Sequence, residues 1–116
     1  WTIDDDQPVF SPAVARMLHY IDQNLKQAID VEELSAVSNM SVRSIYNAFS
    51  KSFSITPKCY VKQRKLQQLR ADLLTGRCRN VTEVALDYGF SHLGRFSSDY
   101  RKMFGELPSE TLRMAG

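Results

Sequence analysis

Three polar side chains able to hydrogen-bond to nucleic acid recur at four-residue spacing. In "MSVRSIYNAFSKSF", residues 40–53, these are Arg43, Asn47 and Lys51, and the spacing places them on one side of a helix. Arginine can donate two hydrogen bonds to guanine, and asparagine can both donate to and accept from adenine. Lysine suits phosphates, which position a protein on a duplex without specifying sequence. The stripe therefore predicts a helix face that reads DNA.

A second stretch, "DYGFSHLGRFSSDYRKMF" at residues 87–104, has the layout of a short helix, a turn at Gly89 and a second helix opening at Ser91. Helical spacing divides this second helix into an inward face of Phe96, Tyr100 and Met103 and an outward face of Gly94, Arg95, Ser98 and Lys102. Solvated helix faces more often carry Glu and Lys pairs. The two outward faces together carry one acid, Asp99, at an edge, which favours a DNA-facing role.

The two stretches belong to an internal repeat. "EELSAVSNMSVRSIYNAFSKSFSITP" and "TEVALDYGFSHLGRFSSDYRKMFGELP" match at an offset of 50 as far as Ser41 with Ser91, and at an offset of 51 from Ile45 with Phe96 onward. The second copy thus has one extra residue between its serine and its first core aromatic. Each copy has the helix-turn-helix layout, whose second helix enters the DNA major groove. An ordinary α-hairpin duplicated for stability is the alternative.

The remaining segments also have helical periodicity, so the predicted fold class is all-α. The segment 12–25 has apolar residues at helical spacing behind a proline. Asp30 with Glu33, and Asn80 with Glu83, resemble capping boxes that start two further helices. The aromatic residues of the second copy lie at core spacing, so we interpret them as packing rather than base-stacking residues: Phe90, Phe96, Tyr100 and Phe104.

A long helix is predicted between the two copies. Thr56 would cap it and Gly76 would end it, with a core stripe at Leu66, Leu69 and Leu73. Its roughly 18 residues would span about 27 Å. The predicted organisation is a linker at 1–11 and one domain at 12–116, with a helix-turn-helix at about 31–53, the connecting helix at about 57–75 and a second helix-turn-helix at about 81–104.

Composition and charge agree with a soluble domain that has a polyanionic partner. The 116 residues are 43% hydrophobic and 24% charged, and no apolar run reaches the roughly 18 residues of a membrane span. Residues 1–40 hold 2 basic and 7 acidic side chains, a net charge of −5, whereas residues 41–116 hold 13 and 6, a net of +7. Because the first residue is Trp1, we expect the chain to be a piece of a longer protein.

The residue set does not support an enzyme, a metal site or a cofactor. Cys59 and Cys78 are 19 positions apart without neighbouring ligands, so we expect two thiols rather than a zinc site, with a disulfide as the minor alternative. No Ser-His-Asp set, metal cluster, phosphate loop or paired carboxylates in an apolar context can be assembled from the sequence. A helical protein-interaction module without specific DNA binding is the main alternative.

With these motifs in place, the sequence resembles the AraC/XylS family of bacterial transcription regulators over roughly residues 12–114. The resemblance is carried by "VALDYGFSHLGRFSSDYRKMFGELPSE", by "ELSAVSNMSVRSIYNAFSKSFSITPKCYV" and by the "RKL" at 64–66. It implies seven helices, with two helix-turn-helix units joined by one long connecting helix. The motifs "RSIYNAF", "ALDYGF" and "HLGRF" look most like the XylS/BenR type, which activates benzoate and alkylbenzoate degradation.

The resemblance also implies site residues. Arg43, Ser44 and Asn47 fall where the first recognition helix reads bases, and Leu93, Gly94, Arg95 and Ser98 fall at the corresponding places in the second. To phosphates we assign residues at the starts and ends of these helices and on the connecting helix: Ser41, Lys51, Arg64, Lys65, Ser91, His92 and Lys102. For Arg64 and Lys65, solvation of the helix is the alternative, and for His92 a polar helix start.

The sequence departs from the family pattern at several positions. A serine is common where Gly94 stands, an arginine where Ser98 stands and a small residue where Arg70 stands. The second unit would therefore read fewer bases directly and leave more to Arg95. The closing helix carries "TLR", where an aromatic residue followed by arginine is usual.

The family further implies partners and a setting. The partners are double-stranded promoter DNA, RNA polymerase and a small aromatic effector held by a missing N-terminal domain, with no membrane and no cofactor. The location is the bacterial cytoplasm, at the nucleoid.

Overall fold

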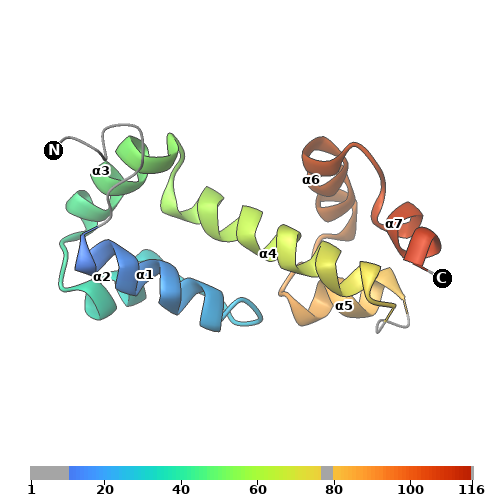
Figure 1. Ribbon diagram of the computed structural model, residues 1–116, viewed down its shortest axis with the longest axis horizontal. Coiled ribbons are helices and arrows are strands. Elements are labelled where there is room, and N and C mark those ends of the chain that lie inside the picture. The colour runs from blue at the N-terminus through green and yellow to red at the C-terminus, as the bar shows by residue number, and fades with distance from the viewer. Residues whose placement is uncertain (1–10, 77–79, 116) are drawn as a thin grey trace, which may run out of the picture. The chain divides into compact units, whose positions relative to one another are not determined.

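The structure is a computed structural model that describes residues 11–76 and 80–115, and these residues form seven helices (Figure 1). In chain order they are α1 (Pro12–Gln23), α2 (Val31–Ser38), α3 (Val42–Phe53), α4 (Pro57–Leu74), α5 (Val81–Asp87), α6 (Leu93–Phe104) and α7 (Pro108–Ala115). No strand occurs in the described part of the chain. The predicted all-α class with seven helices is confirmed.

The helices belong to two compact units. The first unit contains α1, α2, α3 and the start of α4 as far as Lys62. The second contains the rest of α4 from Gln63 onward, then α5, α6 and α7, and it also includes the short segment 26–28 between α1 and α2. Each unit therefore contains one copy of the repeat and part of the long helix.

Four helices begin at polar residues that the sequence marks as caps. In each, a side-chain oxygen accepts a bond of 2.7–3.1 Å from the backbone N–H three residues later; the capping residues are Asp30, Ser41, Thr56 and Asn80. Such a bond satisfies one of the N–H groups that the first turn of a helix leaves without a partner. Local chemistry thus sets where α2, α3, α4 and α5 start.

Burial in the first unit follows the predicted stripes. Met17 and Ile21 of α1, Leu34 of α2, and Ile45 and Phe49 of α3 have almost no solvent exposure. Beside them the rings of Phe49, Phe53 and Tyr60 pack in a cluster, with centroid separations of 5.6, 5.3 and 4.7 Å. The aromatic cluster attaches α3 to the beginning of α4.

In the second unit, α6 packs through a row of rings. Phe90, Phe96, Tyr100 and Phe104 follow one another with centroid separations of 5.1, 6.1 and 4.7 Å. The predicted packing role of these rings is confirmed, because each lies against a neighbouring ring. The predicted stripe of α4, which is Leu66, Leu69 and Leu73, is buried in the same unit.

The repeat also preserves the backbone conformation at the helix ends. Asn39 (φ 60°) and Gly89 (φ 86°) follow the first helix of each copy, and Ser54 (φ 59°) and Gly105 (φ 76°) follow the second. All four adopt the left-handed conformation, which is common after helices and which glycine adopts without a steric penalty. The first copy therefore tolerates strain at two positions where the second copy has glycine.

We predict that Ser54→Gly will raise the free energy of unfolding by about 0.5–1 kcal/mol, because it relieves the left-handed strain after α3. The reverse change, Gly105→Ser, is expected to lower it by a similar amount. Urea unfolding followed by circular dichroism measures both variants.

The matched control for Ser54→Gly is Ser50→Gly, at an exposed position inside α3. There glycine only weakens the helix, by about 0.5 kcal/mol. A loss of stability in both variants would contradict the role assigned to the positive φ at Ser54.

Candidate nucleic-acid interface

The first candidate surface is the outward face of α3. Ile45 and Phe49 are buried, at 0% and 1% exposure, and this fixes which side of the helix faces the core. Arg43, Asn47 and Lys51, which the sequence places on the opposite stripe, are all exposed. The structure therefore brings three side chains of the DNA-reading type together on one accessible face.

The start of α3 is fixed by two serines that were assigned to DNA. The Ser41 hydroxyl accepts from the Ser44 backbone N–H at 3.1 Å and donates to the Ser44 hydroxyl oxygen at 2.9 Å. Both residues are exposed. Ser41 therefore already caps the helix, while the Ser44 hydroxyl keeps its own proton for an outside acceptor.

The second recognition helix begins later than the sequence suggests. The expectation that it opens at Ser91 is wrong: α6 runs from Leu93, and its N-cap is His92, which makes no side-chain cap bond. Ser91 and His92 precede the helix, and both are exposed. Measured from the N-cap, the extra residue of the second copy is therefore Ser91.

With His92 aligned to Ser41, the outward residues of the two helices correspond at the constant offset of 51. Gly94 then matches Arg43, Arg95 matches Ser44, Ser98 matches Asn47 and Lys102 matches Lys51. All of these α6 residues are exposed, as is Leu93. Both faces have a lysine at the same aligned position. The arginine of α6 lies one position later in the alignment than the arginine of α3.

No neighbour among the described residues requires Gly94 to be glycine. A Cβ atom built on Gly94 would meet no heavy atom within 4 Å, and its φ is not positive. The absent side chain leaves a bare stretch of backbone on the outward side of α6.

The two basic residues predicted on α4 already have partners in the second unit. The Lys65 ammonium donates to the carbonyl oxygens of Gln27, at 2.8 Å, and Tyr88, at 3.4 Å. It is half-buried, and loss of solvent lowers the pKa of Lys65. Arg64 donates to the Gln67 side-chain oxygen at 2.6 Å. These bonds support a structural role for Lys65, and its assignment to phosphate stays a prediction.

Sequence reasoning missed two exposed apolar side chains on α3. Val42 is 38% exposed and Tyr46 is 44% exposed, and they are one helical turn apart, beside Arg43 and Asn47. Helical spacing could have predicted the exposure of Tyr46, because this residue lies between the inward Ile45 and the outward Asn47. An apolar contact of this kind can recognise a thymine methyl group.

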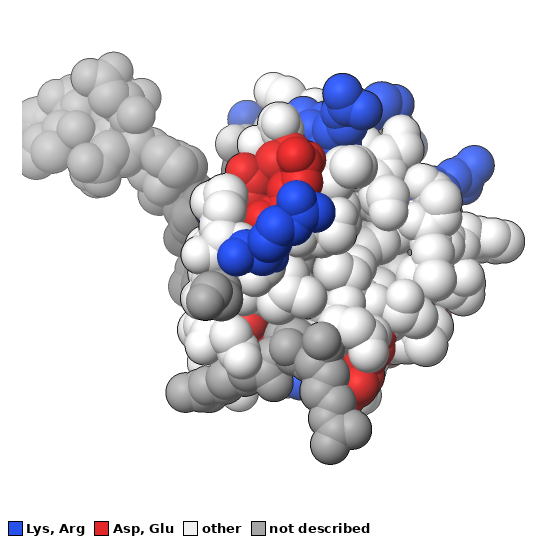
Figure 2. Space-filling view, turned by 90° about the vertical axis from the view of Figure 1, so that its right-hand side faces the viewer, with Lys and Arg blue, Asp and Glu red and all other residues white. Residues whose placement is uncertain are grey.

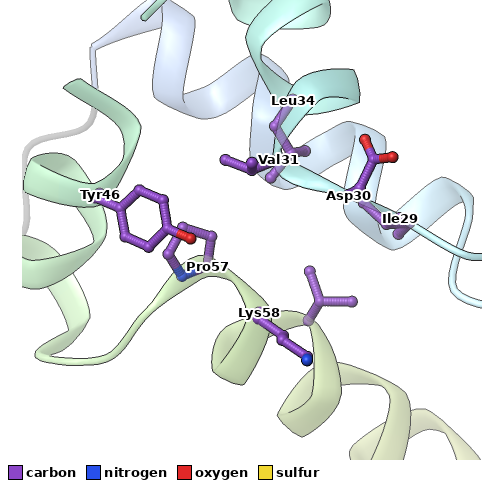
Figure 3. A pocket seen from close by; sticks show the side chains of 8 residues that line it. Ile29, Asp30, Val31, Leu34, Tyr46, Pro57 and Lys58 are labelled. Carbon is purple, nitrogen blue, oxygen red and sulfur yellow. The ribbon is translucent and has the colours of Figure 1, made fainter. Parts of the chain in front are cut away.

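Tyr46 also borders a pocket of about 300 Å³ in the first unit. In Figure 3 its ring lies beside Pro57, with Val31 and Leu34 across the hollow and Lys58 at one side. The pocket joins α3 to the starts of α2 and α4, and most of its lining side chains are apolar. Tyr46 therefore has one edge against the protein and the other toward solvent.

Charge is unevenly distributed over the surface. On the face drawn in Figure 2, most of the basic side chains lie in the upper half beside a group of acidic ones, further acidic side chains lie lower down, and much of the surface between them is uncharged. On α3 there is no acid, and on α6 the one acid, Asp99, is half-buried. The outward faces of both helices thus lack the exposed carboxylates that would repel a phosphate backbone.

Other kinds of site find no support among the described residues. No group of three or more His, Cys, Asp or Glu side chains there could hold a metal ion. No helix among them combines the length and hydropathy that crossing a bilayer demands. Cys59 is half-buried and forms no disulfide. Cys78, its neighbours Arg77 and Arg79, and residues 1–10 of the linker predicted at 1–11 lie outside the described residues.

Comparison with known proteins gives consistent relatives. A family model described as "Helix-turn-helix domain" matches residues 34–114. The chain is 50% identical over 105 residues to the XylDLEGF operon transcriptional activator of Pseudomonas putida, which covers 89% of this chain and 33% of that protein. It is 47% identical over 106 residues to the XylDLEGF operon transcriptional activator 2 of the same species. That match covers 90% of this chain and 68% of that protein. The chain thus spans about a third of the length of the first of these relatives.

A solved structure of a transcriptional regulator is also similar to this chain. The chain matches the crystal structure of a probable AraC family transcriptional regulator from Rhodopseudomonas palustris CGA009 with a TM-score of 0.83 and 42% sequence identity. The match covers 90% of this chain and 98% of that one. The similarity to that regulator, in both sequence and fold, therefore extends over most of this chain.

For Gly94→Ala we predict opposite effects on stability and on DNA binding. The free energy of unfolding should rise by about 0.5 kcal/mol, because alanine favours helix and its methyl group meets open space. Affinity for duplex DNA should fall, because the methyl group occupies the gap on the outward side of α6. Urea unfolding and fluorescence titration of a labelled duplex measure the two quantities.

Gly94→Ser, which adds a larger side chain at the same position, should lower the affinity at least as much. An unchanged affinity in both variants would show that Gly94 is only a weak point that the helix tolerates.

Proposed function

Because the chain belongs to the AraC/XylS family of transcriptional regulators and corresponds to their helix-turn-helix DNA-binding domain, we propose that it binds double-stranded DNA sequence-specifically through α3 and α6. The two helices would lie in successive major grooves, as helix-turn-helix recognition helices do. The observation that carries the proposal is the exposed stripe of Arg43, Asn47 and Lys51, held outward by the burial of Ile45 and Phe49.

The chemistry divides between affinity and specificity. Lys51 and Lys102 would neutralise phosphates and release counterions, which gives salt-dependent binding on any sequence. Arg43 and Asn47 would add bidentate hydrogen bonds to base edges, which depend on sequence. On α6, Arg95 would supply the main base contact, since Gly94 and Ser98 offer little or no reach.

The capping residues would add weaker contacts. Ser41, Ser91 and His92 precede the two helices and are exposed, so they can approach phosphates near the helix N-termini, where the backbone N–H groups favour an anion. Leu93 and Ser44 would lie at the base-contacting surface. Arg64 and Lys65 would be the least direct phosphate contacts, given their present partners.

The wider role is also proposed. The relatives are operon transcriptional activators of Pseudomonas putida, and the XylS/BenR-like motifs point to an activator of an aromatic-acid catabolic operon. An upstream domain would bind the aromatic effector, with residues 1–11 as its linker, and the bound protein would contact RNA polymerase. Such a regulator would act in the bacterial cytoplasm, at the nucleoid.

The alternative is a helical protein-interaction module without specific DNA binding. It is favoured by the exposed Val42 and Tyr46, which offer apolar contact on the same helix. The two functions differ in salt dependence, because binding by apolar contact does not release counterions. Retention on duplex DNA that falls steeply between about 50 and 200 mM salt supports DNA binding.

The decisive experiment is the selection of bound duplexes from a random pool. Two short enriched blocks about 10 base pairs apart, one helical turn, would support docking of both helices. One enriched block would mean that a single helix reads sequence, and no enrichment at all would overturn the proposed function.

We predict that Arg43→Ala and Asn47→Ala will each weaken binding to the selected duplex by about 1–3 kcal/mol and relax base preference at one position. Lys51→Ala should weaken binding similarly on selected and random duplexes and reduce the salt slope by about 1. Titrations at several salt concentrations on both duplexes provide these values.

The control variant is Arg16→Ala, which removes the same charge from an exposed position on α1. It should have a smaller effect than Arg43→Ala on the selected duplex. An equal loss of affinity on selected and random duplexes in Arg43→Ala would refute base reading by that residue.

A further inference from the structure

Four polar side chains in the second unit form a continuous network that joins α4, α6 and α7. The Tyr100 hydroxyl of α6 donates to the Thr111 hydroxyl oxygen of α7 at 2.7 Å. Thr111 in turn donates to the carboxylate of Glu106, in the turn between these helices, and Glu106 Oε2 lies 3.9 Å from Arg70 Nη2 of α4. We call Tyr100, Thr111, Glu106 and Arg70 the α6 network.

Arg70 contacts the end of α6 a second time through its guanidinium plane. Its Cζ lies 5.2 Å from the centre of the Phe104 ring, the last residue of the helix. Its Nε is buried and has no hydrogen-bond partner among the described residues. Arg70 thus contacts both Phe104 and Glu106. It keeps these contacts although burial leaves its Nε without a hydrogen bond.

The network is buried where it meets α6. Tyr100 and Thr111 are both 0% exposed, so their hydroxyls must find hydrogen-bond partners within the protein. Burial is the main cause that raises the pKa of Tyr100, which keeps its phenol protonated as a donor. Removing the Thr111 hydroxyl would take one hydrogen-bond partner from the buried Tyr100 hydroxyl and one from Glu106.

Residues of other types stand at the corresponding positions of the first unit. At the offset of 51, Tyr100 corresponds to Phe49 and Thr111 corresponds to Tyr60, and these two rings pack together at 5.3 Å. Glu106 corresponds to Ile55. Among the described residues an aromatic cluster supports α3, whereas α6 has directional hydrogen bonds in addition to its row of rings.

We propose that the α6 network is a positioning device that fixes the rotation of α6 about its own axis and thereby aims Arg95 at the bases. Apolar contacts are largely non-directional, so rings alone allow a helix to roll over its core. Hydrogen bonds weaken steeply when bent, so Tyr100 and its partners select one orientation. The consequence at DNA rests on the proposed function, but the fixing of α6 does not.

Thr111→Val and Thr111→Ser test the proposal as a matched pair, since valine keeps the shape and serine keeps the hydroxyl. In the 116-residue chain, amide hydrogen exchange of α6 should be about tenfold faster in Thr111→Val and within about twofold of the parent in Thr111→Ser. Amides of α3 should keep their rates in both. Unchanged α6 exchange in Thr111→Val would overturn the proposal, as would an equal acceleration in α5, which would mean a general loss of stability.

Duplex selection then tests the consequence at DNA. The block read by α6 is the one whose preference disappears in Arg95→Ala. Arg70→Met should weaken preference in that block about tenfold, keep the other block and leave the salt slope unchanged. A salt slope reduced by about 1, with both blocks intact, would make Arg70 a phosphate contact and overturn its positioning role.

The two proposals fail in different ways. If the parent chain enriches no block, the proposed function is wrong, and hydrogen exchange alone decides whether the α6 network holds the helix. If the parent enriches two blocks but Arg70→Met and Thr111→Val leave both the α6 block and α6 exchange unchanged, the positioning role is wrong while the proposed function stands.

Discussion

The burial of two side chains one helical turn apart is the constraint on which each recognition helix depends. Ile45 with Phe49 in α3, and Phe96 with Tyr100 in α6, are the buried side chains of their helices, and burying each fully is worth about 1.5–3 kcal/mol. A helix anchored at two points on one side cannot roll far without exposing an apolar side chain. The outward stripes are therefore set in the first place by the core, and in α6 the hydrogen bonds through Tyr100 narrow the orientation of the helix further.

Much of the fold could be predicted because its signals are local. Asp30, Ser41, Thr56 and Asn80 cap helices through bonds to residues three positions away, so short sequence windows contain both partners. The start of α6 could not be found in this way, since Ser91 is a better capping residue than His92. The core overrides that preference.

The spacing between cap and core explains the override. Ser41 precedes Ile45 by four residues and His92 precedes Phe96 by four, so the N-cap lies at a fixed distance before the first buried side chain. Lys65 shows the other limit of local reasoning. Its acceptor at Gln27 is 38 residues away, and no helical stripe indicates that a lysine will turn toward a distant carbonyl.

The two copies differ in how they hold a recognition helix and in what that helix presents, and these differences are linked. Arg43 and Asn47 have long or branched polar side chains whose rotamers can adapt to small errors in helix placement. In α6, Gly94 and Ser98 take their places, so in the proposed complex the backbone itself would come close to the duplex, with little side-chain reach to correct a misplacement. A helix that reads at short range needs a firmly fixed orientation, and directional bonds through Tyr100 provide it where an aromatic cluster would not.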